Sequence, residues 1–196
     1  MRCPCLESLN LLAGMRAASS CRGTTLWELL CVMVVAGILL GIAVPGFQTL
    51  ALDSAQTADI NAFVLAIQLA RSESSKRGRT IVLCKSANSS DCGRKEIRYD
   101  AGWMVFVNED EVRPPQRSSQ EPLLYVHIPQ SAGSISANRA RFEFRAFRRR
   151  STNGTVTFCD RRGTSAAKAV IVSYTGRPRV SRLGPGDRAL VCAELP

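Results

Sequence analysis

The chain has 196 residues and a formal net charge of +10, because 26 Lys and Arg residues outnumber 16 Asp and Glu residues. That length suits one domain with an extension. The only histidine is His127, and the cysteines beyond the apolar N-terminal region show no C-x-x-C spacing, which argues against zinc. No catalytic triad or phosphate-binding glycine loop is apparent. We therefore expect a protein that is not an enzyme and that uses no metal or cofactor.

An apolar run without any charged residue covers residues 29–47. It approaches the roughly 20 residues that span a bilayer. An ordinary secretory signal is cleaved after its apolar core, whereas the apparent processing point here, Arg22-Gly23, precedes it. Cleavage there would leave the apolar helix on the mature protein. Glu28 stands at the edge of this run, either as a functional carboxylate or as an interfacial residue favoured by the helix dipole.

Helical spacing of apolar residues continues beyond Pro45, and Gly78 is suited to end the helix. We expect one helix over residues 25–77, roughly 80 Å long and kinked at Pro45. Its first half would lie in a membrane or a filament core. Its second half would pack against a sheet.

The rest of the chain is typical of antiparallel β-structure. Phe142 and Phe144 alternate with charged residues, so that one strand face should be buried. Residues 109–121 are the best candidate for a mobile loop. The candidate strands are residues 79–85, 102–108, 123–128, 141–147, 155–159 and 168–174. The expected fold class is α+β.

The N-terminal pattern resembles the class III signal of type IV pilins and pseudopilins in the segment Gly-Thr-Thr-Leu-Trp-Glu-Leu-Leu (residues 23–30) and in Pro45. Thr24 replaces the phenylalanine that is usual in the family. The resemblance implies cleavage by prepilin peptidase between Gly23 and Thr24, and N-methylation of Thr24. It also implies that Glu28 pairs with the N-terminal amine of a neighbouring subunit, since buried opposite charges need a partner.

This resemblance divides the chain into a leader (residues 1–23), a transmembrane and assembly segment (24–50) and a periplasmic globular domain (51–196). Met15 as the start would give a typical short basic leader. The implied fold is the type IV pilin fold, a long kinked helix packed on antiparallel sheet. The implied location is the inner membrane, crossed once with the C-terminal domain in the periplasm, and then an extracellular pilus. Other major and minor pilins and prepilin peptidase are the implied protein partners.

Later motifs narrow the family. Gly-Trp-Met-Val-Phe (102–106), Phe-Cys-Asp-Arg-Arg-Gly (158–163) and Gly-Arg-Pro-Arg (176–179) resemble the FimT/FimU minor pilins and GspH pseudopilins, with the FimT branch favoured. Four cysteines in the exported part suggest two disulfides. We expect the pairs Cys84–Cys92 and Cys159–Cys192. The two other pairings, and reduced buried thiols, stay open.

The Gly-Arg-Pro-Arg segment is the functional candidate. Gly176 allows a tight turn, and Pro178 favours an extended conformation of Arg177. Arg177 and Arg179 should then project from one face and suit contacts to successive phosphates. Strict alternation places the nearby Arg182 on the other face.

In the FimT branch a C-terminal Gly-Arg-x-Arg motif is linked to DNA binding in natural transformation. The resemblance thus implies a minor pilin that binds double-stranded DNA of any sequence through Gly176, Arg177 and Arg179, with Arg182 assisting. The alternatives are an exposed turn in a structural minor pilin or secretion pseudopilin that primes filament assembly, and an unrelated membrane-anchored enzyme. A second basic cluster would extend the phosphate track or form a solvated strand face: Arg139, Arg141, Arg145, Arg148, Arg149 and Arg150, with Arg161 and Arg162 nearby in sequence.

Overall fold

The computed structural model of the chain describes residues 24–93, 96–146 and 151–193, apart from the side chain of Pro45. The expected leader, residues 1–23, lies outside the described residues. The chain divides into two compact units, Met1–Pro45 and Gly46–Pro196. This boundary precedes the one expected between residues 50 and 51.

Helix α1 (Leu26–Arg77) begins and ends within a residue of the bounds expected from the sequence. The Thr25 hydroxyl accepts a hydrogen bond from the Glu28 N–H at 3.3 Å, which caps the first turn. At the other end Gly78 has a φ of 66° and donates its N–H to the Ser74 carbonyl at 3.0 Å. An 18-residue window near the N-terminus of α1 has a mean hydropathy of 2.6, so α1 is long and apolar enough to cross a membrane. The kink at Pro45 stays a prediction.

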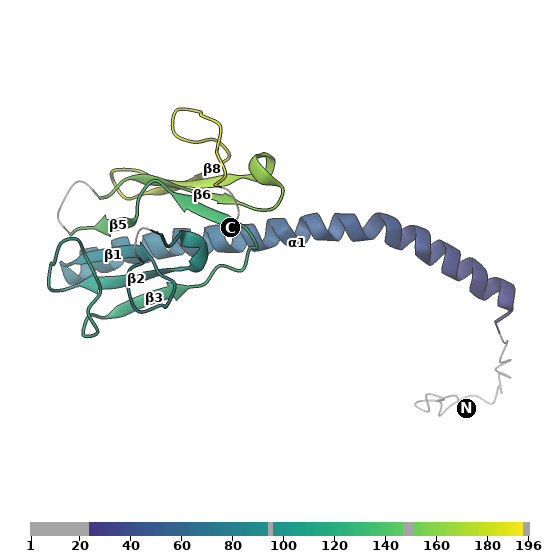
Figure 1. Ribbon diagram of the computed structural model, residues 1–196, viewed down its shortest axis with the longest axis horizontal. Helices are drawn as coiled ribbons and strands as arrows, with labels where there is room; N and C mark the ends of the chain where they lie inside the picture. Colours follow the sequence, from purple (N-terminus) through teal and green to yellow (C-terminus); the bar gives the residue numbers. More distant parts are fainter. Residues whose placement is uncertain (1–23, 94–95, 147–150, 194–196) are drawn as a thin grey trace, which may run out of the picture. The chain divides into compact units, whose positions relative to one another are not determined.

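Two antiparallel sheets follow α1, which confirms the α+β class (Figure 1). The first has the strand order β3-β2-β1-β5 and the second the order β4-β6-β7-β8. The strands of the first sheet are β1 (Thr80–Lys85), β2 (Trp103–Asn108), β3 (Leu123–His127) and β5 (Arg141–Phe144). Those of the second are β4 (Ser134–Ala137), β6 (Gly154–Cys159), β7 (Lys168–Val172) and β8 (Pro178–Ser181), and the short helices are η1 (Tyr99–Ala101) and η2 (Gly163–Ala166).

The strands β4 and β8 were not expected from the sequence. Strand β4 reads Ser-Ile-Ser-Ala, which lacks the run of β-branched and aromatic residues that marks a strand. The sequence of strand β8 begins with Pro178, and a proline at this place is more typical of a turn than of a strand. Proline has no N–H to donate, but it is tolerated at the first residue of an edge strand, the position that Pro178 occupies.

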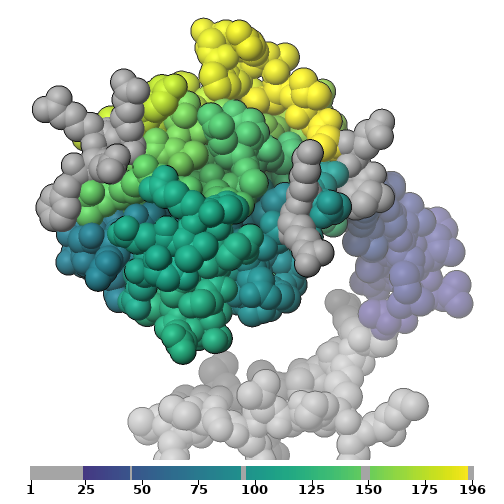
Figure 2. All heavy atoms as spheres, turned by 60° about the vertical axis from the view of Figure 1, so that its left-hand side comes forward, coloured from purple at the N-terminus to yellow at the C-terminus, as the bar shows by residue number. Residues whose placement is uncertain are grey.

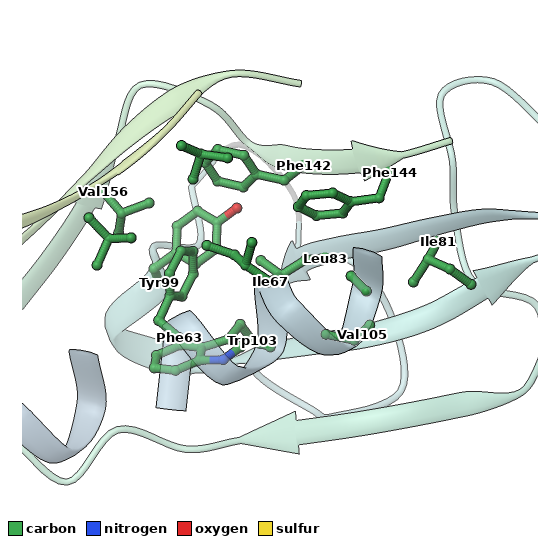
Figure 3. Packing of buried hydrophobic residues seen from close by; sticks show 14 of the residues in the cluster. Phe63, Ile67, Ile81, Leu83, Tyr99, Trp103, Val105, Phe142, Phe144 and Val156 are labelled. Atoms are coloured by element: carbon green, nitrogen blue, oxygen red, sulfur yellow. The ribbon is translucent and has the colours of Figure 1, made fainter. Parts of the chain in front are cut away.

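The core of the globular unit centres on Phe63 of α1 (Figure 3). Its fully buried ring meets four aromatic rings edge-on, at centroid distances of 5.3–6.1 Å. Trp103 and Phe142 come from the first sheet, Phe158 comes from the second, and Tyr99 comes from η1. The Phe63 side chain of the helix therefore contacts both sheets. The expected alternation in β5 is confirmed, because Phe142 and Phe144 are buried.

A buried carboxylate fixes the same helix to the first sheet. Asp59 accepts hydrogen bonds from the N–H groups of Gln130 at 3.1 Å and Ser131 at 2.9 Å, and its Oδ1 lies 3.0 Å from His127 Nε2. Burial alone would raise the pKa of Asp59, but the hydrogen bonds from Ser131 and His127 outweigh it and lower the pKa. His127 thus takes part in a structural contact between α1 and β3.

The loop expected to be mobile is organised around a buried carboxylate. Glu121 accepts hydrogen bonds from the backbone N–H groups of Glu109 at 2.7 Å and Ser118 at 2.9 Å. These bonds join the two ends of the segment to each other. The loop is therefore held by its own residues.

The described residues contain two disulfides, and they are the pairs that we expected. Cys84–Cys92 closes the turn after β1, and Cys159–Cys192 joins the C-terminal segment to the end of β6. The segment between β8 and Cys192 forms a projecting loop, yellow in Figures 1 and 2. The second disulfide therefore returns the chain to the second sheet after this loop.

Candidate functional site

The Gly-Arg-Pro-Arg segment forms the end of a tight hairpin between β7 and β8. Ser173 donates its N–H to the Arg177 carbonyl at 3.1 Å, and Gly176 donates its N–H to the Ser173 carbonyl at 2.8 Å. Gly176 has a φ of 72°. Three-residue hairpin loops commonly place a glycine in this left-handed conformation. The hairpin therefore requires glycine at this position, in agreement with the sequence.

The strand register decides where the two arginines point. Ile171 pairs with Arg179 and Val172 pairs with Pro178. Val172 lies in the core, so Arg179 lies on the opposite, outer face of the sheet. Arg177, two residues earlier in the extended chain, shares that face, and both arginines are exposed. Their backbone positions are about 7 Å apart at the usual rise of a strand.

Neither Arg177 nor Arg179 forms an ion pair with any residue that the structure describes. We call these two residues the open end of the second sheet. Their positive charges face solvent without a described counter-charge.

The structure does not bring Arg182 together with the open end. Arg182 lines a different cavity, of about 340 Å³, beside Lys168 and Thr57 of α1. It is close enough to Asp53 to help lower the pKa of that carboxyl, although the hydrogen bond from Arg162 is the largest cause. The opposite parity expected for Arg182 from strand alternation agrees with this placement.

The other end of the second sheet holds an arginine whose charge is compensated. Arg162 forms ion pairs with Asp160, which follows β6, and with Asp53 of α1, the latter at 2.7 Å. Hydrogen bonds to Asp160 and Asp53 raise the pKa of Arg162. We call Arg162, Asp160 and Asp53 the paired end. Arg162 therefore does not extend a phosphate track from the open end.

Three further arginines of the second basic cluster have hydrogen-bond partners within the protein. Arg145 pairs with Glu143 at 2.6 Å, and Arg141 donates a hydrogen bond to the Pro115 carbonyl. Arg139 is exposed and donates to the Asn153 carbonyl at 3.1 Å. The other three arginines of that cluster, residues 148–150, lie outside the described residues.

Sequence reasoning missed one arginine that the fold places beneath the hairpin. A Cβ atom on Gly176 would lie 3.2 Å from Arg71 Cδ and 3.1 Å from Ser151 Oγ. Arg71 belongs to α1, so more than a hundred residues separate it in sequence from the hairpin. Helical periodicity reports nothing about such a distant contact, and no local motif marks Arg71.

A family model described as type II transport protein GspH matches residues 59–176, more than half of the chain. The match ends at Gly176, just before the two arginines of the open end. No curated protein matches the chain.

Two crystal structures of the type IV minor pilin FimU from Pseudomonas aeruginosa strain PAO1 resemble the chain. The form in space group P65 has 18% identity and a TM-score of 0.45, and covers 65% of this chain and 90% of that one. The form in space group P21 has 19% identity and a TM-score of 0.47, with 68% and 90% covered. These likenesses assign no site residue.

Proposed function

The chain belongs to the GspH family of type II transport proteins, and on that premise we propose that it is a type IV pilus minor pilin that binds double-stranded DNA for uptake in natural transformation. The contact surface is the open end, Arg177 and Arg179. The proposal depends on one observation: two exposed arginines share the outer face of a hydrogen-bonded hairpin and have no described counter-charge.

The chemistry of the open end suits a phosphate backbone. A guanidinium group presents several donors in a plane and binds phosphate oxygens strongly. The two arginines are about 7 Å apart along the chain, and a DNA strand rises about 3.4 Å per phosphate. Each arginine can therefore reach a different phosphate. Such contacts displace counterions and carry no sequence information, so binding should not depend on sequence.

The hairpin keeps the arginines in place without using their side chains. The Ser173 hydroxyl accepts from the Arg177 N–H at 3.2 Å, and the register with β7 fixes Arg179. Both side chains thus remain available to a ligand while their backbone is held. This preorganisation reduces the conformational cost of binding.

The test is the affinity of the full chain, in a zwitterionic detergent, for two short duplexes of unrelated sequence. Replacing Arg177→Ala together with Arg179→Ala should weaken both complexes to the same extent. Arg177→Lys with Arg179→Lys should retain part of the affinity, because the charge remains. Arg161→Ala removes an exposed arginine beside the paired end and serves as the control. Unchanged affinity in the double alanine variant would reject the site.

A second candidate function is filament assembly without DNA binding. The observation that favours it is the first turn of α1, where Glu28 is exposed beside exposed apolar residues such as Leu29 and Val32. After cleavage between Gly23 and Thr24, Glu28 would be available to the N-terminal amine of a neighbouring subunit.

Two observations separate the candidates. The Glu28→Ala variant should enter sheared filaments less well than the wild type if Glu28 serves assembly. A deletion strain that keeps its pili but loses transformation supports DNA capture, whereas loss of piliation supports the assembly role.

A further inference from the structure

A polar pocket of about 410 Å³ lies beneath the hairpin loop, between α1 and the end of β5. Arg71 and Arg145 are its charged lining residues, and no carboxylate lines it among the described residues. Arg145 pairs with Glu143, whereas Arg71 forms no ion pair with any described residue. The pocket therefore carries an uncompensated guanidinium group.

Some hydrogen-bond donors of the pocket are already used within the protein, and only the others can bind a ligand. Serine hydroxyls of α1 in this pocket donate hydrogen bonds to backbone carbonyls of the preceding turn of the helix: Ser72 to the Leu69 carbonyl at 3.0 Å, and Ser74 to the Arg71 carbonyl at 2.8 Å. Ser151, by contrast, makes no side-chain hydrogen bond to the residues that the structure describes. The Arg71 guanidinium and the Ser151 hydroxyl remain as donors, together with the Gln68 side-chain amide and the Arg145 Nε, which is buried without a described partner. Of these groups, Arg71 carries the uncompensated charge, and a guanidinium beside a hydroxyl suits an anion.

Both donors lie against the hairpin loop at Gly176, next in sequence to the open end, whose arginines project from the outer face of the sheet. Arg71 Cδ and Ser151 Oγ would each lie within 3.2 Å of a Cβ on Gly176, the residue that precedes Arg177. The helix dipole opposes an anion only near the last turn of α1, which ends at Arg77. Arg71 lies more than one turn before that end, so the attraction of its full positive charge for an anion outweighs the repulsion from the helix dipole.

We propose that Arg71 and Ser151 bind a phosphate group in this pocket, and that DNA held at the open end places a backbone phosphate there. This inference deepens the proposed function and rests on it for the source of the phosphate. It adds a third cationic contact to the two in the hairpin. The inference also gives Gly176 a second role, because a side chain there would crowd both donors.

The salt dependence of DNA binding tests this contact in the full chain. Arg71→Gln should lower the slope of log affinity against log salt by about 0.9, the value for one phosphate contact on duplex DNA. Arg71→Lys should restore most of that slope. Arg161→Gln removes an exposed arginine at the far end of the sheet and should leave the slope unchanged.

Failure of the inference differs from failure of the proposed function. An unchanged slope in Arg71→Gln, beside a lowered slope in the Arg177→Ala, Arg179→Ala variant, overturns the pocket and keeps the open end.

Inorganic phosphate tests the pocket without DNA. If the wild type binds no DNA, titration with inorganic phosphate should still shift the backbone amide resonances of Ser151 and Thr175. The Arg71→Gln variant should lose these shifts. In that case the ligand of the pocket is free phosphate and not the DNA backbone. Absence of shifts in the wild type overturns the pocket.

Discussion

The two ends of the second sheet both carry arginines, but they differ in their counter-charges. At the paired end Arg162 lies between Asp160 and Asp53. At the open end Arg177 and Arg179 are exposed without a described carboxylate partner. A formal net charge of +10 says only that basic groups are in excess. The distribution of the carboxylates decides which arginines are available to a polyanion.

The largest expected effect separates stability from binding. Cys159→Ser with Cys192→Ser removes the disulfide beside the paired end, whose sequence separation is 33. Loop-closure entropy predicts a loss of roughly 3–4 kcal/mol in the free energy of unfolding. The salt slope of DNA binding should stay the same, because the hydrogen bonds with β7 hold the hairpin. Denaturant unfolding and binding are measured on the same preparation.

That prediction is contradicted in one specific case. A variant that remains folded but loses the wild-type salt slope would show that the disulfide positions the open end.

An intermediate effect compares two glycines, one at each end. Gly176 has a φ of 72° and Gly163 a φ of 73°, so alanine should cost about 1–2 kcal/mol at either position. A Cβ at Gly163 meets nothing within 4 Å, whereas one at Gly176 meets three side chains at 3.1–3.2 Å. Gly176→Ala should therefore lower the free energy of unfolding more than Gly163→Ala. Equal losses of stability in the two variants would mean that the hairpin loop moves to accommodate the new Cβ atom at no cost in free energy.

The smallest effect depends on pH and belongs to the paired end. The hydrogen bond from Arg162 lowers the pKa of Asp160 below its ordinary value. The ionised carboxylate therefore stabilises the fold above the unfolded pKa of about 4, and this stabilisation is lost as the pH falls through the folded pKa. Asp160→Asn should be less stable than the wild type at neutral pH, with a difference that shrinks in acid. A difference that is independent of pH would argue against the ion pair.

The sequence was sufficient for features that depend on local pattern. Apolar periodicity and Gly78 predicted α1 to within a residue at each end, and the alternation around Phe142 predicted the buried face of β5. Strand alternation also placed Arg177 and Arg179 on one face, because the period of a strand is two. Strand β4 escaped prediction because three of its four residues, all except Ile135, are small or polar and have little strand propensity of their own, so that the strand depends on pairing with β6.

Long-range contacts could not be predicted from one sequence. Arg161 and Arg162 appeared to belong with the other basic residues, but Asp53 reaches Arg162 from a helix 109 residues away. Arg71 gave no signal because its proximity to Gly176 exists only in the folded chain. In both cases an arginine is close to a residue that is distant in sequence, because α1 packs against the second sheet.

The central claim is that the open end, and not the paired end, binds DNA. The most direct measurement is the salt slope of duplex binding for two double variants of the full chain, Arg177→Ala with Arg179→Ala and Arg161→Ala with Arg162→Ala. Loss of two phosphate contacts should lower the slope of the first variant by about 1.8 and leave that of the second variant unchanged. Equal reductions in both variants, or a reduction in the second alone, would contradict the account.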